Sequence, residues 1–177
     1  KFTATTSLWQ FHVVRSLMAV PLVALLAVMG FGRFWPYRWK PVIARSAVIG
    51  VSMLFYFGSL AFMPISQALA GLFTSPIFVL LINTLVMGQR IGPWRMFAVA
   101  IGFVGILLVL QPGADGFGWT SLMPLAAGLF YAIGAIATRS WCAGESALTL
   151  SAGVMAMLGV MGAVGLGLVP LFGFESV

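Results

Sequence analysis

The sequence predicts an all-α polytopic membrane protein in which six apolar helices cross the bilayer. Of its 177 residues, 62% are hydrophobic and 7% are charged, whereas a soluble domain carries about a quarter charged residues. The apolar segments are 18 to 26 residues long, which suits helices crossing a hydrocarbon core of about 30 Å and exceeds the length of membrane-barrel strands. The connections between the segments alternate between basic and nearly uncharged, which is typical of a multi-pass protein.

Six predicted spans follow one another along the chain. In order they are Leu8–Gly30, Pro41–Met63, Gln67–Gly88, Trp94–Gln111, Trp119–Thr138 and Ala147–Phe172. The third holds Pro76 at its middle, and proline cannot donate the hydrogen bond that the carbonyl of Leu72 would otherwise accept. In lipid a freed carbonyl needs another partner, and Thr74 and Ser75 are the nearest candidates. We therefore expect a spanning helix with a polar break.

The charges and the tryptophans predict one topology. Seven of the nine basic residues fall on one side of the six spans: Arg33, Arg38, Lys40, Arg45, Arg90, Arg95 and Arg139. The positive-inside rule makes that side cytoplasmic, and it places Asp115 and Glu175 outside. All six tryptophans lie at segment ends or in connections, where interfacial belts are found: Trp9, Trp35, Trp39, Trp94, Trp119 and Trp141. Two independent signals therefore agree.

The same composition excludes several classes of partner. An excess of basic residues would suggest nucleic acid in a soluble chain, but here these residues flank apolar spans and set orientation, so no nucleic acid is expected. The lone Cys142 excludes an internal disulfide and a multi-cysteine metal site, and no metal or cofactor is predicted. The chain opens at Lys1 without a methionine and stops just after an apolar run, so we expect it to belong to a longer protein.

Small residues recur at helical spacing within the spans. Ala98 and Gly102 form one pair, and Gly159, Ala163 and Gly167 extend the pattern over two intervals. Such positions let helix backbones approach closely in lipid, so we expect them to pack the bundle. A homodimer face is the alternative.

The run from Ala68 to Gly113, ALAGLFTSPIFVLLINTLVMGQRIGPWRMFAVAIGFVGILLVLQPG, resembles the signature of the EamA-type transporters in the drug/metabolite transporter superfamily. In that family a proline-bearing helix ends in a Gly-Glu-Arg-like turn, and the next, glycine-rich helix ends in a Pro-Gly turn. Two upstream features also match: an arginine early in the second helix, Arg15, and an aromatic third helix that closes on a proline, FYFGSLAFMP, with Tyr56 and Pro64. The turn departs from the family at Gln89, where glutamate is usual.

The resemblance implies ten helices in two inverted five-helix repeats around a central substrate cavity. This chain would then hold helices two to seven: residues 1–113 form the first repeat without its first helix, and residues 119–177 form the truncated start of the second. In such a repeat, Met155 falls roughly where Arg15 would recur, so little internal symmetry is visible in the sequence.

Arg15 is the one charge placed well inside a predicted span. Inserting arginine at a helix centre costs roughly 2.5–3.5 kcal/mol, so we interpret it as a substrate-binding candidate, with snorkelling toward the outer surface as the alternative. His12 lies one turn earlier on the same face and is a second candidate. Glu145, at the start of the last span, is interpreted as a helix N-terminal charge.

The remaining candidates are polar groups within apolar spans. Ser52, Tyr56 and Ser59 share one helical stripe, which must face protein or a water-filled cavity and therefore serves either interhelical hydrogen bonding or substrate contact. Thr74, Ser75 and Pro76 form a stronger group, because broken helices in transporters cluster at binding sites near the midplane. Tyr131 is a weaker candidate.

These features predict a secondary transporter that moves small polar metabolites, such as amino acids or organic acids, across the cytoplasmic membrane. The partners would be the lipid bilayer and a small-molecule substrate, and the protein would not be an enzyme. An intramembrane enzyme is the poorer alternative, because one histidine and no buried acid in the six spans offer little for acid–base or metal chemistry. A non-transporting assembly subunit remains a second alternative.

Overall fold

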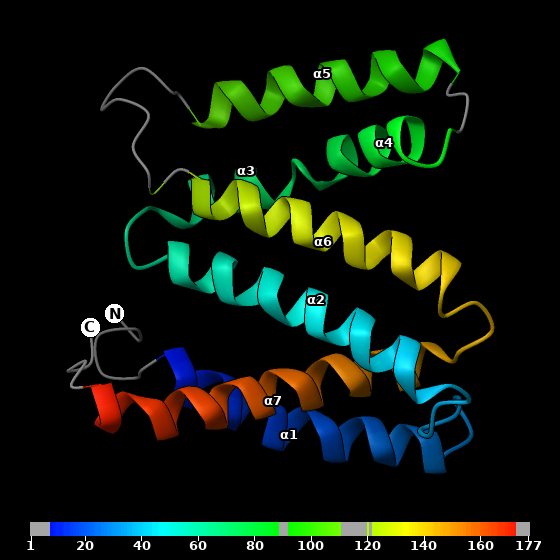
Figure 1. The fold of residues 1–177 in the computed structure, drawn as a ribbon, viewed down its shortest axis with the longest axis vertical. Coiled ribbons are helices and arrows are strands. Elements are labelled where there is room, and N and C mark those ends of the chain that lie inside the picture. The colour runs from blue at the N-terminus through cyan, green and yellow to red at the C-terminus, as the bar shows by residue number, and fades with distance from the viewer. Residues whose placement is uncertain (1–7, 89–91, 111–119, 121, 173–177) are drawn as a thin grey trace. The chain divides into compact units, whose positions relative to one another are not determined.

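The computed structural model describes residues 8–88, 92–110, 120 and 122–172, and these residues form helices joined by short connections (Figure 1). The helices are α1 (Leu8–Val28), α2 (Trp39–Ser59), α3 (Ile65–Leu72), α4 (Ser75–Leu85), α5 (Pro93–Leu110), α6 (Leu122–Ser140) and α7 (Ala147–Phe172). α3 and α4 together make one span, Ile65–Leu85. The described residues are helical with apolar spans, so the predicted all-α membrane fold is confirmed. Within the described part of the chain, five spans are long and apolar enough to cross a membrane, and α5 contains a shorter apolar helix. The turn at Gln89 and Arg90 lies outside the described residues, as do Asp115 and Glu175, which the charge pattern predicts to face outward.

A glycine ends the first span where the chain must turn. Gly30 has φ +88°, a conformation that side-chain-bearing residues rarely adopt. The N–H of Phe31 donates to the carbonyl of Leu26 at 3.2 Å, and the N–H of Gly30 donates to that of Ala27 at 3.1 Å. This pair of bonds is a Schellman motif, which satisfies the last carbonyls of α1 and turns the chain toward α2.

The chain divides into two compact units. The first comprises Lys1–Gly50 and Ser140–Val177, and the second comprises Val51–Arg139, so α2 contributes to both. Each unit draws residues from both sides of the repeat boundary predicted near residues 113–119. The two inverted repeats therefore stay a prediction that the grouping of contacts does not test.

Glycines let α1 and α7 pack closely in the first unit. A Cβ at Gly159 would lie 2.9 Å from that of Ser16, and one at Gly162 would lie 2.9 Å from the backbone oxygen of Trp9. Gly165 lies directly against the Trp9 ring. The hydroxyl of Ser16 also donates to the carbonyl of Met155 at 2.6 Å. Together these contacts form an interhelical seam of the kind that small residues allow in membranes.

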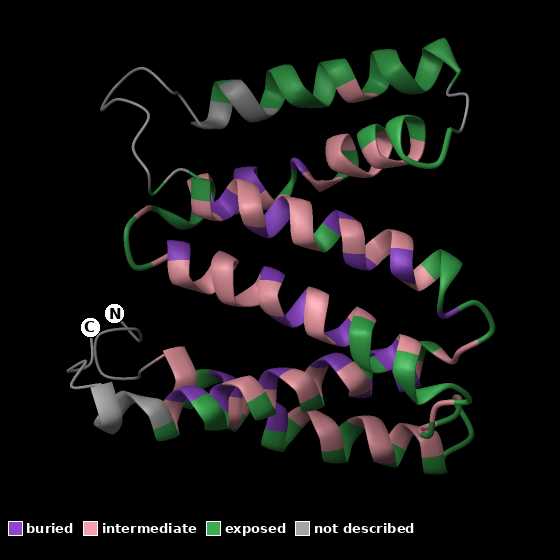
Figure 2. Ribbon diagram, viewed as in Figure 1, coloured by how far each residue is buried: buried purple, intermediate pink, exposed green. Residues whose placement is uncertain are grey.

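The seam differs from the predicted stripe of small residues. It uses Gly159 as expected, but Ala163 is exposed and a side chain at Gly167 would meet nothing within 4 Å among the described residues. The seam follows positions three apart, because α1 lies along that ridge of α7. Ala98 and Gly102 are both exposed, and a side chain at Gly102 would meet nothing within 4 Å among the described residues. Figure 2 shows α5 exposed along most of its length.

Glu145 holds the connection between α1 and α2 against the start of α7. Its carboxylate accepts the backbone N–H of Tyr37, at 2.9 and 3.1 Å to its two oxygens, and that of Arg38 at 2.9 Å. Nearby, the N–H of Arg33 donates to the hydroxyl oxygen of Ser146 at 3.2 Å. The interpretation of Glu145 as a simple helix-terminal charge was therefore incomplete, because its partners lie more than a hundred residues earlier in the chain.

We expect Glu145→Gln to loosen this connection. An amide presents one acceptor oxygen where the carboxylate presents two, and charge-assisted hydrogen bonds are roughly twice as strong as neutral ones. Tryptic cleavage after Arg38 should become severalfold faster in the folded protein, with a loss of stability of about 1 kcal/mol. Ser146→Ala, which removes a neutral acceptor from the same connection, should have a smaller effect. Equal cleavage of wild type and Glu145→Gln would show that the carboxylate does not hold the connection.

Candidate functional site

The third span is broken near its middle, within the second unit. α3 ends at Leu72 and α4 begins at Ser75, so the interruption falls at Phe73 and Thr74. Both residues keep nearly helical dihedral angles, with φ −69° and ψ −6° at Phe73 and φ −70° and ψ −12° at Thr74. Pro76 lies in the first turn of α4, where proline is tolerated because N–H groups there have no partner within the helix. The break thus precedes the proline that causes it.

The hydroxyl of Thr74 satisfies a carbonyl at the break, although not the expected one. Thr74 Oγ1 donates to the carbonyl oxygen of Gly71 at 2.5 Å, whereas the sequence suggested Leu72. The backbone N–H of Thr74 donates to the same oxygen at 3.1 Å, so a tight turn brings Gly71 rather than Leu72 within reach. The Thr74 carbonyl in turn accepts from Ile77 and Phe78 at 2.9 and 3.2 Å, which starts α4. Thr74 is only 4% exposed, so this polar group lies inside the protein.

Small residues of α6 lie directly against the break. A Cβ at Gly128 would stand 2.5 Å from Thr74 Oγ1 and 2.7 Å from the carbonyl oxygen of Gly71. One at Gly71 would stand 2.8 Å from the carbonyl carbon of Pro124. Two glycines therefore let the backbones of α3 and α6 meet where the span is interrupted. This close approach places backbone polar groups of two helices at mid-span.

The polar stripe of α2 is hydrogen-bonded within the second unit. The hydroxyl of Ser52 donates to the carbonyl of Ala127 on α6 at 2.7 Å, and the hydroxyl of Ser59 donates to the carbonyl of Tyr56 at 2.6 Å. Ser52 and Ser59 are fully buried, whereas Tyr56 is half-buried, with its ring edge-to-face on Phe57. The stripe supplies interhelical and local hydrogen bonds, and each serine oxygen keeps acceptor capacity.

Tyr131 of α6 follows an aromatic residue that packs against α2. Tyr131 is 39% exposed, so its ring is accessible. The preceding residue, Phe130, stacks on Phe55 of α2 with the ring centroids 5.7 Å apart and an interplanar angle of 6°. α2 and α6 are thus joined by a ring stack and by the hydrogen bond from Ser52.

Arg15 and His12 belong to the first unit, on α1. The guanidinium Nη2 of Arg15 lies 3.6 Å from Sδ of Met155, the residue expected at the equivalent place in a second repeat. His12 is fully buried, and its ring packs edge-to-face with Phe11 at a centroid distance of 5.6 Å. The Arg15 side chain therefore points toward α7, between the helices.

The structure brings part of the predicted site together and adds residues that the sequence did not indicate. Ser52 and Thr74 contact successive residues of α6, Ala127 and Gly128, so α6 joins the polar stripe to the broken span. Ser75 begins α4 beside them, half-buried, while Pro76 is exposed. The run of small residues in α6 is the signal in the sequence that could have identified this helix. His12 and Arg15 form a separate group on the first unit.

Comparisons with known proteins agree on one family. The profile of the EamA-like transporter family matches residues 1–111. A riboflavin transporter of Rhizobium johnstonii is 31% identical over 156 residues, covering 88% of this chain and 50% of that protein. A riboflavin transporter of Vibrio cholerae is 28% identical over 149 residues, covering 84% of this chain and 49% of that protein. An uncharacterized transporter of Helicobacter pylori is 25% identical over 115 residues, covering 60% and 39%. The chain spans about half the length of the first two, and no solved structure matches it significantly.

Proposed function

Because the chain belongs to the EamA-like transporter family, we propose that it forms part of a secondary transporter that moves a small polar metabolite across the cytoplasmic membrane. It is a multi-pass protein of the cell membrane. The observation that carries the proposal is the break at the middle of the span Ile65–Leu85, lined by Thr74 and faced by Gly128 of α6. Interrupted helices expose backbone polar groups, and transporters use such groups to bind substrates near the midplane. The proposal includes no catalytic step.

Riboflavin is the first substrate that we propose. Two relatives that align with most of this chain are named riboflavin transporters. Amino acids and organic acids, the classes expected from the sequence analysis, are the comparison substrates. The candidate contacts in the second unit are Thr74 and Ser75 at the break, Ser52, Tyr56 and Ser59 on α2, and Tyr131 on α6. His12 and Arg15 on α1 are separate candidates in the first unit. We further propose that residues 1–113 and 119–177 belong to two inverted repeats of the complete transporter.

The test is uptake by the intact transporter reconstituted in liposomes. Labelled riboflavin, a neutral amino acid and a dicarboxylate are offered in parallel, each with an excess of unlabelled solute as competitor. We expect saturable uptake of riboflavin that the other two solutes do not inhibit. Saturable uptake of the amino acid or of the dicarboxylate instead would show that this solute, and not riboflavin, is the substrate. A well-inserted protein that transports none of the three would contradict the proposal.

Pro76→Ala tests the role of the break within the same assay. Phe73 and Thr74 already have nearly helical dihedral angles, so alanine can donate to the carbonyl of Leu72 and join α3 to α4. We expect normal insertion with transport reduced about tenfold, because the polar turn is replaced by continuous helix. Pro41→Ala, at the start of α2 outside the break, is the matched control. Unchanged kinetics in Pro76→Ala would assign the proline to packing alone.

A further inference from the structure

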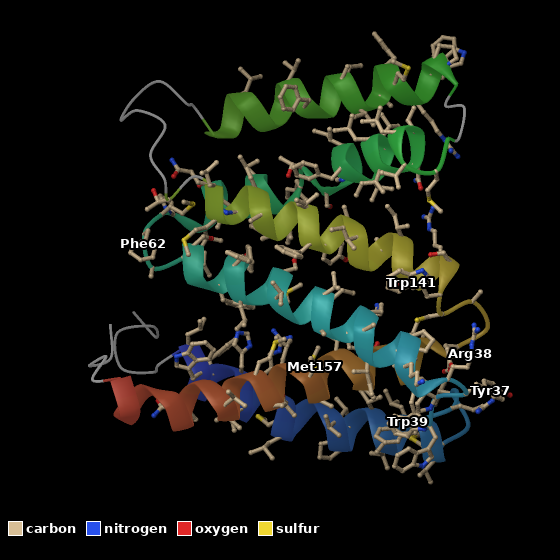
Figure 3. All side chains as sticks on the ribbon, viewed as in Figure 1. Tyr37, Arg38, Trp39, Phe62, Trp141 and Met157 are labelled. Carbon is tan, nitrogen blue, oxygen red and sulfur yellow. The ribbon has the colours of Figure 1, made fainter. Side chains whose placement is uncertain are left out.

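The first unit contains a pocket that none of the predicted site residues lines. It has a volume of about 310 Å³ and lies between α1, α2, α7 and the connection from α1 to α2. That volume is at the lower end of the range for small-molecule sites, about 300–1,000 Å³. Trp35 and Trp39 line it from the connection and from the first residue of α2, and Met157 lines it from α7. Figure 3 shows Trp39 at the end of α2 that is joined to this connection.

The aromatic residues lie together along the connection and the start of α2. The rings of Trp35 and Trp39 are 5.7 Å apart at an angle of 52°, and Phe34 packs edge-to-face on Trp35 at 5.5 Å. Both tryptophans are more than half exposed, so their ring faces are accessible. The charge pattern predicts that this end of the unit is cytoplasmic. Accessible indole faces of this kind are surfaces on which a planar ring can stack.

Ser46 supplies a polar group in the wall. It is 1% exposed and lines the pocket, and none of the residues that the structure describes gives its hydroxyl a hydrogen-bond partner. The hydroxyl lies against Gly153, where an added Cβ would stand 2.8 Å away. Leaving a buried hydroxyl unpaired costs about 1–3 kcal/mol. Rotation of the Ser46 side chain about χ1 would let its hydroxyl meet a polar group of a ligand, which would recover that cost.

The rest of the lining sets the chemical class of the ligand. Among the described residues around the pocket none is charged, and the other hydroxyl, that of Thr149, donates to the carbonyl of Arg33 at 2.6 Å. An ionised carboxylate or ammonium there would lose its hydration without a counter-charge, which is costly. A neutral ligand with a flat apolar body loses little on entry and gains stacking on the tryptophans.

We infer that this pocket binds a neutral, planar aromatic heterocycle, which stacks on Trp35 and Trp39 and exchanges a hydrogen bond with the hydroxyl of Ser46. The inference adds a site to the first unit, separate from the broken span in the second. Only the choice of a flavin ring as the probe rests on the proposed function. Stacking on the tryptophans sets the plane of the ligand ring, and the hydrogen bond with Ser46 selects the edge of the ring that points into the pocket.

The test is binding of lumichrome, the flavin ring without its sugar-like chain, to the purified intact transporter. Its fluorescence is titrated with protein, since stacking on indole quenches flavin emission. We expect saturable quenching in the wild type, weakened about tenfold by Trp39→Leu and about three- to tenfold by Ser46→Ala. Ser46→Ala should not destabilise the ligand-free protein, because it removes an unpaired group.

Two matched variants control for general effects. Trp141→Leu removes another tryptophan of the same unit that does not line the pocket, and Ser151→Ala removes an exposed hydroxyl on α7. Both should bind lumichrome as the wild type does. Two competitors should not displace lumichrome: ribitol, which is the neutral chain alone, and succinate, which is an aliphatic dianion.

Two outcomes would overturn the inference. One is that the wild-type protein does not bind lumichrome and retains a lipid chain in the pocket instead. The other is binding that Trp39→Leu and Ser46→Ala leave unchanged. The transport assay is independent of this binding assay. Lumichrome binding without riboflavin uptake would contradict the proposed function alone. Riboflavin uptake that the pocket variants leave intact, together with no binding of lumichrome, would contradict this inference alone.

Discussion

Gly71→Ala is expected to destabilise the second unit by about 3 kcal/mol, the upper end of the range for overpacking. The added methyl would stand 2.8 Å from the carbonyl carbon of Pro124 and closer still to its ring. Backbone and a proline ring cannot rotate away, so α3 and α6 must separate. Separation would also disturb the contact between Gly128 and Thr74 at the break.

The measurement is thermal unfolding of the intact transporter in detergent, followed by tryptophan fluorescence. Gly102→Ala on α5 is the matched control, because its Cβ would meet nothing within 4 Å among the described residues. There alanine should stabilise the helix by about 0.8–1 kcal/mol, the usual gain over glycine. The two substitutions are chemically identical and should shift the transition in opposite directions. A Gly71→Ala variant as stable as wild type would contradict the close packing at the break.

The fold class was predictable because it depends on local quantities. Length, hydropathy and the alternation of basic connections gave six spans, and the helix bounds agree within a few residues. The break in the third span followed from one proline. Its position at Phe73 and Thr74 did not, because the tight turn at Gly71 depends on how α6 packs against it.

Interactions between distant segments could not be read from the sequence. Glu145 binds backbone N–H groups, which every residue except proline carries, so nothing in the composition of the connection marks its partner. The glycine seam follows the ridge of α7 that faces α1, and a stripe of small residues does not reveal which neighbour it faces. Tryptophans at span ends predicted an interfacial belt, whereas Trp35 and Trp39 also line a pocket whose wall includes α7, more than a hundred residues later in the chain.

Arg15→Lys is expected to reduce transport at least tenfold at normal expression. Lysine keeps the charge and can still reach the membrane surface, but it loses the planar fork that pairs with two oxygens of a solute. Charge-assisted hydrogen bonds contribute about 1.5–3 kcal/mol, which corresponds to a tenfold effect or more. The guanidinium lies between α1 and α7, with Nη2 3.6 Å from Sδ of Met155, so it points into the bundle.

Met155→Leu is the matched control for Arg15. It removes the sulfur beside the guanidinium, nearly conserves side-chain volume, and leaves the carbonyl that accepts from Ser16. Its uptake should remain close to wild type, while Arg15→Lys raises KM for the solute that the transporter carries. Arg15→Leu separates binding from anchoring, because loss of the charge should lower membrane insertion only if Arg15 positions the helix. If Arg15→Lys leaves uptake unchanged and Arg15→Leu inserts poorly into the membrane, Arg15 anchors the helix and does not belong to the substrate site.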